Sequence, residues 1–244
     1  MKIIGIIPAR YASTRFPGKP LVDIQGKSMI QRVYEQCIKA DKLSSVLIAT
    51  DDQRIYDHVI SFGGKAWMTS HEHQSGTDRC AEIIESGKAG DWDAVINIQG
   101  DEPYIHPEQI NLLCEVMQEK SVAIGTLVKK IDAQSELFNH NNVKVVLNNK
   151  LDAIYFSRSP IPFNRNFPED EWLKHSTYYK HIGIYGYKTK TLLEISKLAK
   201  TNLEITESLE QLRWIENGYQ IKAAVTHLES VSIDTPDDLL KINE

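Results

Sequence analysis

Cysteine is scarce in this chain of 244 residues, and the three cysteines that it has stand far apart, at Cys37, Cys80 and Cys114. No pair has the spacing of a metal-ligand set or of a redox motif, so we interpret them as buried, reduced thiols in a reducing compartment. A chain of this length can bury most of its apolar surface, and so needs no disulfide or structural metal to fold.

Long apolar segments are also missing. The first apolar run, residues 3–7, ends at Pro8 and Arg10 before it reaches the length of a signal peptide. No segment approaches the ~20 apolar residues that a membrane helix needs. We therefore expect no membrane insertion and a cytoplasmic location.

The chain has no excess of positive charge, since 28 Lys and Arg residues stand against 33 Asp and Glu residues and give a net charge of -5. A protein whose main partner is a nucleic acid usually presents a basic face, so this balance argues against nucleic-acid binding. It leaves room for anionic small ligands, which need only a local basic cluster.

Apolar runs of strand length alternate with segments of helical period in the first half of the chain. The expected strands are 2–7, 45–50, 65–68, 94–98 and 122–128, and the expected helices are 28–40, 54–62, 77–86 and 107–119. This order predicts an α/β fold with a mainly parallel twisted sheet flanked by helices on both faces. Ligands of such sheets bind beyond the carboxyl ends of the strands, near a switch in strand order.

The pattern changes after about residue 130. We expect strands at 143–147, 153–156, 179–187 and 221–225, a proline-containing loop at 159–168, and a final helix that begins at 234–236. Ile205, Leu209, Leu212 and Ile215 predict one further helix, which ends at Asn217-Gly218. No clean linker separates the halves, so the second half is expected to insert into the first or to lean on it.

A basic loop follows the first strand. Arg10, Arg15 and Lys19 lie within ten residues, with small residues between them that let backbone N–H groups approach a ligand. A polyphosphate needs such a nest of cations and amides. A solvated basic loop is the alternative, but Gly18 between two prolines indicates a fixed shape. Neither the P-loop signature nor a dinucleotide-binding glycine motif is present, which lowers the odds of a dinucleotide oxidoreductase.

Two carboxylates follow expected strands. Asp101 lies in Gln99-Gly100-Asp101-Glu102-Pro103, at the end of a central strand, where it would face the basic loop. Hard oxygens near phosphates usually bind Mg²⁺. Asp234 is the second candidate. The alternatives are a turn cap for Asp101 and a helix N-cap for Asp234.

Two histidines, His71 and His73, precede the segment Ser75-Gly76-Thr77-Asp78-Arg79. They could ligate a metal, but no third soft ligand is nearby, so a zinc site is disfavoured. We predict a polar, ligand-facing loop that runs into a helix.

Motifs in a fixed order across nearly the whole chain resemble the 3-deoxy-manno-octulosonate cytidylyltransferase (CMP-Kdo synthetase) family. They are IPARYASTRFPGKP at 7–20, SGTDR at 75–79, QGDEP at 99–103, VKVV at 143–146, YFSR at 155–158, HIGIY at 181–185, ESLEQLR at 207–213 and VSIDTP at 231–236. Their shared order is far more specific than any single motif.

The resemblance implies a nucleotide-diphospho-sugar transferase-like fold, with a smaller mixed α/β subregion for sugar binding and dimerisation. It implies a Mg²⁺-dependent homodimer that converts CTP and 3-deoxy-manno-octulosonate (Kdo) into CMP-Kdo and pyrophosphate, for lipopolysaccharide assembly in Gram-negative bacteria. It makes residues 1–244 one domain, in which about 1–130 bind the nucleotide, about 131–230 serve sugar binding and dimerisation, and 231–244 return to the main body.

Carried over position by position, the resemblance assigns roles to the motif residues. Arg10, Ser13, Arg15 and Lys19 would hold the triphosphate, Ser75, Arg79 and Gln99 would lie near the cytosine and ribose, Asp101 and Asp234 would hold Mg²⁺, and Arg158, His181, Tyr185, Glu210 and Gln211 would line the sugar pocket. Arg10, Arg15, Lys19 and Asp101 form the expected catalytic set.

For several sugar-pocket residues a second interpretation stays open. Arg158 could pair with the sugar carboxylate or form a structural salt bridge. His181 could hydrogen-bond sugar hydroxyls, carry a proton or pack in the core. Glu210 and Gln211 lie beside the apolar stripe of their expected helix, so their side chains can point away from the core, and an exposed helix face is the alternative for both.

The alternatives for the whole protein are a cytidylyltransferase for 8-amino-Kdo or a sialic acid, and a non-catalytic nucleotide sensor. A sensor is expected to have lost Asp101, Asp234 or the basic loop, and all are present. His71 receives no role, and the loop 160–174 could affect the choice of acceptor.

Overall fold

A computed structural model describes residues 1–12, 16–87, 89–229 and 232–242. Ser13 and Arg15, two of the predicted triphosphate ligands, lie outside the described residues. The remaining predicted site residues can all be placed.

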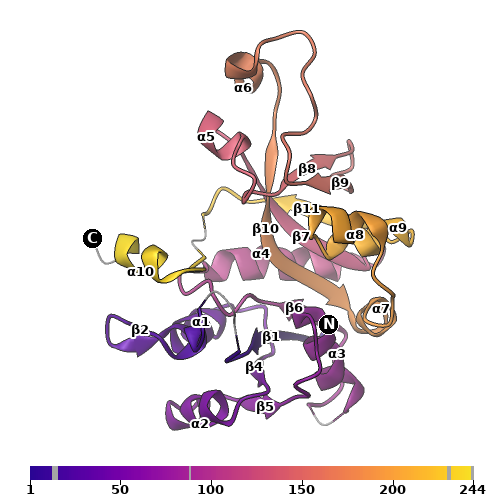
Figure 1. The fold of residues 1–244 in the computed structure, drawn as a ribbon. Coiled ribbons are helices and arrows are strands. Elements are labelled where there is room, and N and C mark those ends of the chain that lie inside the picture. The colour runs from indigo at the N-terminus through magenta and orange to yellow at the C-terminus, as the bar shows by residue number, and fades with distance from the viewer. Residues whose placement is uncertain (13–15, 88, 230–231, 243–244) are drawn as a thin grey trace.

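One large sheet runs through the molecule (Figure 1). Across it the strands follow the order β11 (Ile221–Val225), β7 (Ile124–Lys130), β10 (Tyr179–Lys188), β6 (Ala94–Asn97), β1 (Ile3–Ala9), β4 (Ser45–Thr50) and β5 (Ala66–Met68). The hairpin of β8 (Lys144–Leu147) and β9 (Ala153–Ser157) pairs with β10, while β2 (Asp23–Ile24) and β3 (Lys27–Ser28) form a separate small hairpin.

The sheet is mainly parallel, as predicted. β1 pairs in parallel with β4 and β6, and β7 pairs in parallel with β11. The antiparallel pairs are those of β10 with β6, β7 and β8, and that of β8 with β9. Because β10 belongs to the second half of the chain and lies between two strands of the first half, both halves share one sheet.

Helices cover both faces of the sheet, and the alternation of side chains along β1 shows why. Ile3 and Ile7 pack into one core and Ile4 and Ile6 into the other, because successive side chains of a strand point to opposite faces. The first core is covered by α1 (Met29–Cys37), α2 (Gln53–Ser61) and α4 (Pro107–Gln118), and the second by α3 (Gly76–Glu85), α7 (Thr189–Ile195) and α9 (Gln211–Glu216). The strands and helices predicted for the first half are confirmed, with small shifts at their ends.

The three cysteines are free and buried, as predicted. Cys37 and Cys114 pack in the first core and Cys80 packs in the second. Burial raises the pKa of each thiol, that of Cys114 to about 12. All three are therefore protonated, unreactive core residues.

The prediction of a single helix from Ile205 to Ile215 is wrong. The segment forms α8 (Asn202–Glu207) and α9, separated at Ser208, whose φ of 53° is left-handed. Ile205, counted as part of the apolar stripe, is 64% exposed. The break allows Arg213 to reach Glu204 in a buried ion pair of 2.6 Å. In one continuous helix these residues would be roughly 13 Å apart along the axis.

The loop predicted at 159–168 is confirmed, and it begins an arm that projects beyond the sheet (Figure 1). The arm carries α6 (Trp172–His175), preceded by a short 3-10 helix (Glu169–Glu171). Trp172 and Tyr178 pack with Leu137 of α5 (Gln134–Leu137) in a small separate core.

The C-terminal helix α10 (Pro236–Ile242) returns to the first half of the chain. Leu239 packs with Met29 of α1 and with Ile233, which precedes the helix. Among the described residues, no helix combines the length and the apolar character needed to cross a membrane.

Candidate active site

One cleft of about 230 Å³ opens beyond the carboxyl ends of β1 and β6. β1 pairs with β4 on one side and β6 on the other, so the cleft lies at a switch in strand order, where ligands of such sheets bind. Predicted residues from distant parts of the sequence line it together: Arg10, Lys19, Ser75, Arg79, Gln99, Asp101 and Asp234. Pro8, Ala9, Pro20, His73, Gln74, Gly76 and Gly100 complete the lining.

Gly100 allows the loops after β1 and β6 to approach closely. A Cβ atom at this position would lie 2.9 Å from the backbone oxygen of Pro8. That contact is too short for any other residue, so glycine is needed to keep Asp101 beside the loop that follows β1.

Lys19 brings the two predicted metal-binding carboxylates together. Its Nζ lies 2.7 Å from Oδ2 of Asp101 and 3.4 Å from Oδ1 of Asp234. The lysine begins a short 3-10 helix (Lys19–Leu21) that follows Gly18, whose φ of 72° is left-handed. Asp101 and Asp234 thus contact one cationic atom, although they are 133 positions apart in the sequence.

The main chain holds Asp234 at this position. The Ile233 amide donates to the Asp101 carbonyl oxygen at 2.9 Å, and Ile233 itself is fully buried. At the start of α10, the carboxylate of Asp238 accepts from the amides of Asp234 and Thr235. This scaffold leaves the Asp234 carboxylate within reach of Lys19.

The donor set of Asp101 and Asp234 suits Mg²⁺. Both are hard carboxylate ligands, both are partly exposed, and they converge on one point. Mg²⁺ is commonly held by one or two carboxylates, with waters and substrate phosphates as the other ligands. In the part of the chain that the structure describes, no cluster of three or more His, Cys, Asp or Glu side chains offers a different metal site.

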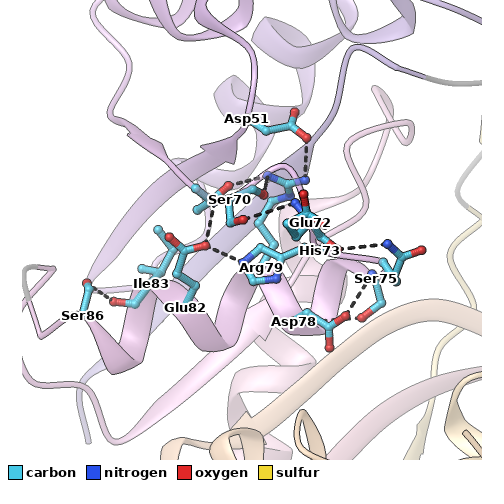
Figure 2. Close-up of polar contacts among 12 residues, drawn as sticks. Asp51, Ser70, Glu72, His73, Ser75, Asp78, Arg79, Glu82, Ile83 and Ser86 are labelled. Atoms are coloured by element: carbon cyan, nitrogen blue, oxygen red, sulfur yellow. Dashed lines mark hydrogen bonds and ion pairs between the residues drawn. The ribbon is translucent and has the colours of Figure 1, made fainter. Parts of the chain in front are cut away.

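Another wall of the cleft is the loop that leads into α3, and the predicted loop-to-helix arrangement is confirmed. Ser75 caps α3, since its hydroxyl accepts from the Asp78 amide while the Asp78 side chain accepts from the Ser75 amide. Arg79 is buried beneath the loop, where it donates to Asp51 at 2.9 Å, to the Ser70 carbonyl and to the Thr69 hydroxyl (Figure 2). Arg79 thus lines the cleft, with its guanidinium bound to the protein itself.

His181 and Tyr185 lie on β10 with their ring centroids 5.0 Å apart. The strand bulges between Ile182 and Tyr185, and a Cβ atom on Gly183 in the bulge would lie 3.8 Å from Cγ of Gln99. The bulge therefore borders the cleft. The Tyr185 hydroxyl is buried and has no hydrogen-bond partner among the described residues.

The protonation of His181 follows from its neighbours. The Thr126 hydroxyl donates its proton to the Ile184 carbonyl at 2.8 Å, so Nε2 of His181 must be the donor in its 2.9 Å contact with Thr126 Oγ1. Burial lowers the pKa of His181 to about 3. A ring that is neutral at neutral pH favours hydrogen bonding as its role over proton carrying.

Glu210 precedes α9 and borders a second hollow of about 630 Å³, which shares Gln74 and Ser75 with the cleft. Its carboxylate accepts from the Thr77 hydroxyl at 3.0 Å, and burial raises its pKa. Gln211 is only 5% exposed, so the alternative of an exposed helix face is wrong for this residue. The break before α9 turns this residue inward.

Arg158 lies outside the residues that line the cleft. Its guanidinium donates to the backbone oxygens of Glu207 at 2.8 Å, His140 at 3.2 Å and Ser208 at 3.3 Å. These bonds tie the end of β9 to the break between α8 and α9. Three of the five guanidinium N–H donors are used in this way, so the bidentate pairing with a sugar carboxylate stays a prediction.

The low pKa of His181 predicts a stability loss at acid pH. In the unfolded chain His181 is protonated near pH 6.5, whereas in the folded protein it stays neutral down to about pH 3. The free energy of unfolding therefore falls as the pH drops from 6.5 towards 3. At pH 5 the loss from this group is about 2 kcal/mol. Urea denaturation at pH 7.5 and pH 5 measures it. The pH dependence of His181→Asn is expected to be shallower, and an unchanged pH dependence would contradict the assignment.

Sequence analysis missed His73, Gln74, Thr77 and Thr126 as contributors to the site. Thr77 and Thr126 act by hydrogen-bonding Glu210 and His181, which no local pattern reveals. His73 and Gln74 stand in a loop that was predicted to face a ligand, but spacing alone does not show which side chains enter the cleft.

Comparisons with known proteins agree over the whole chain. The family described as cytidylyltransferase matches residues 4–223. A 3-deoxy-manno-octulosonate cytidylyltransferase of Parabacteroides distasonis is 55% identical over 245 residues, which cover 99% of this chain and 96% of that protein. The enzyme of the same name from Thermodesulfovibrio yellowstonii is 49% identical, with 98% and 96% covered.

A solved structure of CMP:2-keto-3-deoxy-manno-octonic acid synthetase complexed with CTP superposes with a TM-score of 0.91 at 42% identity, over 99% of this chain and 97% of that one. A 4-diphosphocytidyl-2C-methyl-D-erythritol synthase from Anaerococcus prevotii has a TM-score of 0.61 at 12% identity, with 99% and 97% covered, and shows the shared fold.

Proposed function

The chain belongs to the 3-deoxy-manno-octulosonate cytidylyltransferase family, and from this membership we propose that it converts CTP and Kdo into CMP-Kdo and pyrophosphate. The observation that carries the proposal is the convergence of Asp101 and Asp234 on Lys19, in a cleft at the switch point of the sheet. The product would supply lipopolysaccharide assembly.

In the proposed reaction, the C2 hydroxyl of Kdo attacks the α-phosphorus of CTP and pyrophosphate leaves in line. The protein needs no nucleophile of its own, because its tasks are to orient the reactants and to neutralise charge on the phosphates. Arg10 and Lys19 line the cleft and would be the cations for the triphosphate, and Gln99 and Ser75 line it too and would lie near the base and ribose.

Asp101 and Asp234 are the residues that would hold Mg²⁺ together. When bound, Mg²⁺ neutralises phosphate charge and polarises the phosphorus under attack. The two carboxylates would place that charge in the cleft that Arg10 and Lys19 also line. Lys19 would then exchange its carboxylate partners for phosphate oxygens.

The acceptor would bind beside β10 and the start of α9. His181 and Tyr185 lie side by side on the bulged strand, and Glu210, whose pKa burial raises, interacts electrostatically with Tyr185. Gln211 and Arg158 belong to the same proposed set, with Arg158 as the cation for the sugar carboxylate. The relatives are named for Kdo, which favours this acceptor over 8-amino-Kdo or a sialic acid.

Pyrophosphate release tests the proposal directly. The assay combines each of the four common nucleoside triphosphates with Mg²⁺, with and without Kdo, and repeats CTP with 8-amino-Kdo and a sialic acid. We expect release with CTP and Kdo to exceed every other combination. Binding of CTP without release would support the sensor instead, and faster release with another acid would reassign the acceptor.

We also propose that the chain forms a homodimer in the cytoplasm. Phe163 on the projecting arm is 73% exposed, an apolar side chain that a second copy could cover, and the three free cysteines suit a reducing compartment. Sedimentation equilibrium should give the mass of two chains. A monomer at micromolar concentration would contradict the dimer and leave the proposed reaction intact.

A further inference from the structure

The loop before α3 carries two histidines in very different settings. The side chain of His71 is 82% exposed and pairs with the equally exposed Glu72. The side chain of His73 is 22% exposed, lines the cleft, and has Nε2 in a short contact with Oε2 of Glu82. Only the second histidine is both held in place and open to a ligand.

Glu82 is a fixed anchor on α3, as Figure 2 shows. The carboxylate that contacts His73 also accepts from the Ser70 amide at 2.8 Å. One turn earlier on the same helix, Arg79 donates to the Ser70 carbonyl and to Asp51. Two successive turns of α3 therefore hydrogen-bond to the loop, and these bonds fix the position of His73.

The contact with Glu82 also determines which ring nitrogen of His73 carries a proton. Burial alone would raise the pKa of Glu82, but bonds from the Ser70 amide and from His73 hold that pKa below its usual value. An ionised carboxylate can only accept, so Nε2 of His73 must donate. In the neutral ring, Nδ1 is then a hydrogen-bond acceptor, and no described residue bonds to it.

The neighbouring polar side chains of this loop are less suited to read a base, because Gln74 is exposed and Ser75 is bound to α3 and to Glu210. Gln74 donates from Nε2 to the Glu72 carbonyl at 2.9 Å, and the Ser75 hydroxyl caps α3. Lys19, which suits a triphosphate, and the two carboxylates, which suit its metal ion, come from other segments of the cleft. His73 is thus a half-buried side chain of this loop that lines the cleft with an oriented ring acceptor, and this suits it to bind a nucleobase.

We propose that His73, positioned by Glu82, accepts a hydrogen bond from the 4-amino group of cytosine and so selects cytidine over uridine nucleotides. Uracil has a carbonyl oxygen at this position, which is an acceptor like Nδ1 of His73. Neither acceptor would then have a hydrogen-bond donor, so UTP would bind more weakly. The proposal deepens the proposed function, because it names the residue that distinguishes the base of the triphosphate.

The test compares CTP with UTP for the wild type, His73→Ala, His73→Asn and the control His71→Ala. Titration calorimetry gives the two nucleotide affinities, and pyrophosphate release with Kdo gives kcat/KM for each. We expect His73→Ala to lower the preference for CTP by roughly ten- to a hundredfold. His73→Asn should recover part of it, because its amide oxygen lies near the position of Nδ1. His71→Ala should retain it in full.

Glu82→Gln tests the positioning role. We expect a partial loss of the CTP preference, through a higher KM for CTP with kcat almost unchanged. A residue that served stability alone would lower the melting temperature and leave the ratio of CTP to UTP affinity as it is.

An unchanged ratio in both His73 variants would overturn the proposal, whatever happens to the overall rate. A wild type that binds CTP no better than UTP would overturn it as well. Failure of the reaction itself is distinguishable, because the calorimetric ratio is measured without Kdo and without turnover.

Discussion

Asp101→Asn is expected to lower kcat by roughly 10³-fold while the protein stays folded. The change removes a negative charge and almost no volume. In the structure this charge meets Lys19 at 2.7 Å, and Asp234 meets the same ammonium. The amide oxygen that remains is a much weaker ligand for a divalent cation, so the phosphates would lose their main neutralising charge in the cleft.

The fold should tolerate this change because Asp101 is partly exposed and its ion pair with Lys19 contributes about 1 kcal/mol or less. Pyrophosphate release gives kcat, and a thermal melt reports the fold. Asp132→Asn is the matched control, since Asp132 is an exposed carboxylate that pairs only loosely with Lys130 at 3.8 Å. Near-normal turnover by Asp101→Asn would refute the metal assignment.

Lys19→Ala is expected to raise the KM for CTP by roughly ten- to a hundredfold, the effect of losing a hydrogen bond to a charged group. The KM for Kdo should change little, because the proposed acceptor residues belong to other segments, namely β10, the start of α9 and the end of β9. Initial rates with each substrate varied in turn separate the two constants. Unchanged KM and kcat for CTP would count against a triphosphate role for Lys19.

The same variant makes a second, opposite prediction for the nucleotide-free protein. Without the ammonium, Asp101 and Asp234 repel one another and should bind a divalent cation more tightly than in the wild type. Titration with Mn²⁺ in the absence of CTP measures this. Lys27→Ala is the control, because Lys27 is an exposed lysine that pairs with Glu35, and neither residue lines the cleft.

Local patterns predicted the elements of the first half because each is defined by its own side chains. The isoleucines of β1 face two cores in alternation, and Ser28 caps α1 by accepting from the Gln31 amide. The position of β10 between β6 and β7 was beyond such patterns. Strand order depends on contacts between segments far apart in the chain, which periodicity does not encode.

The break between α8 and α9 shows a different limit. The periodicity of Ile205, Leu209, Leu212 and Ile215 favours one helix, and a buried ion pair between Glu204 and Arg213 favours two. Removing a buried charge from its partner costs several kcal/mol, about 3 to 5, so tertiary pairing outweighs the local pattern.

The candidate site was predicted mainly through the resemblance. Arg10, Gln99 and Asp234 belong to three separate segments that line one cleft. In the sequence, only the shared order of the family motifs indicates that they belong to one site. The resemblance could not show how each side chain is engaged. Arg79 is buried against Asp51, and Gln211 is buried as well. His73 pairs with Glu82, which lies nine positions further along the sequence.

A double-mutant cycle on Mn²⁺ binding tests the central claim most directly. Mn²⁺ affinity is measured by electron paramagnetic resonance, in the presence of CTP, for the wild type, Asp101→Asn, Asp234→Asn and the double variant. If both carboxylates hold one ion, each single variant loses most of the affinity and the double variant loses little more. Two independent, additive losses, or wild-type affinity in either single variant, would contradict the shared site.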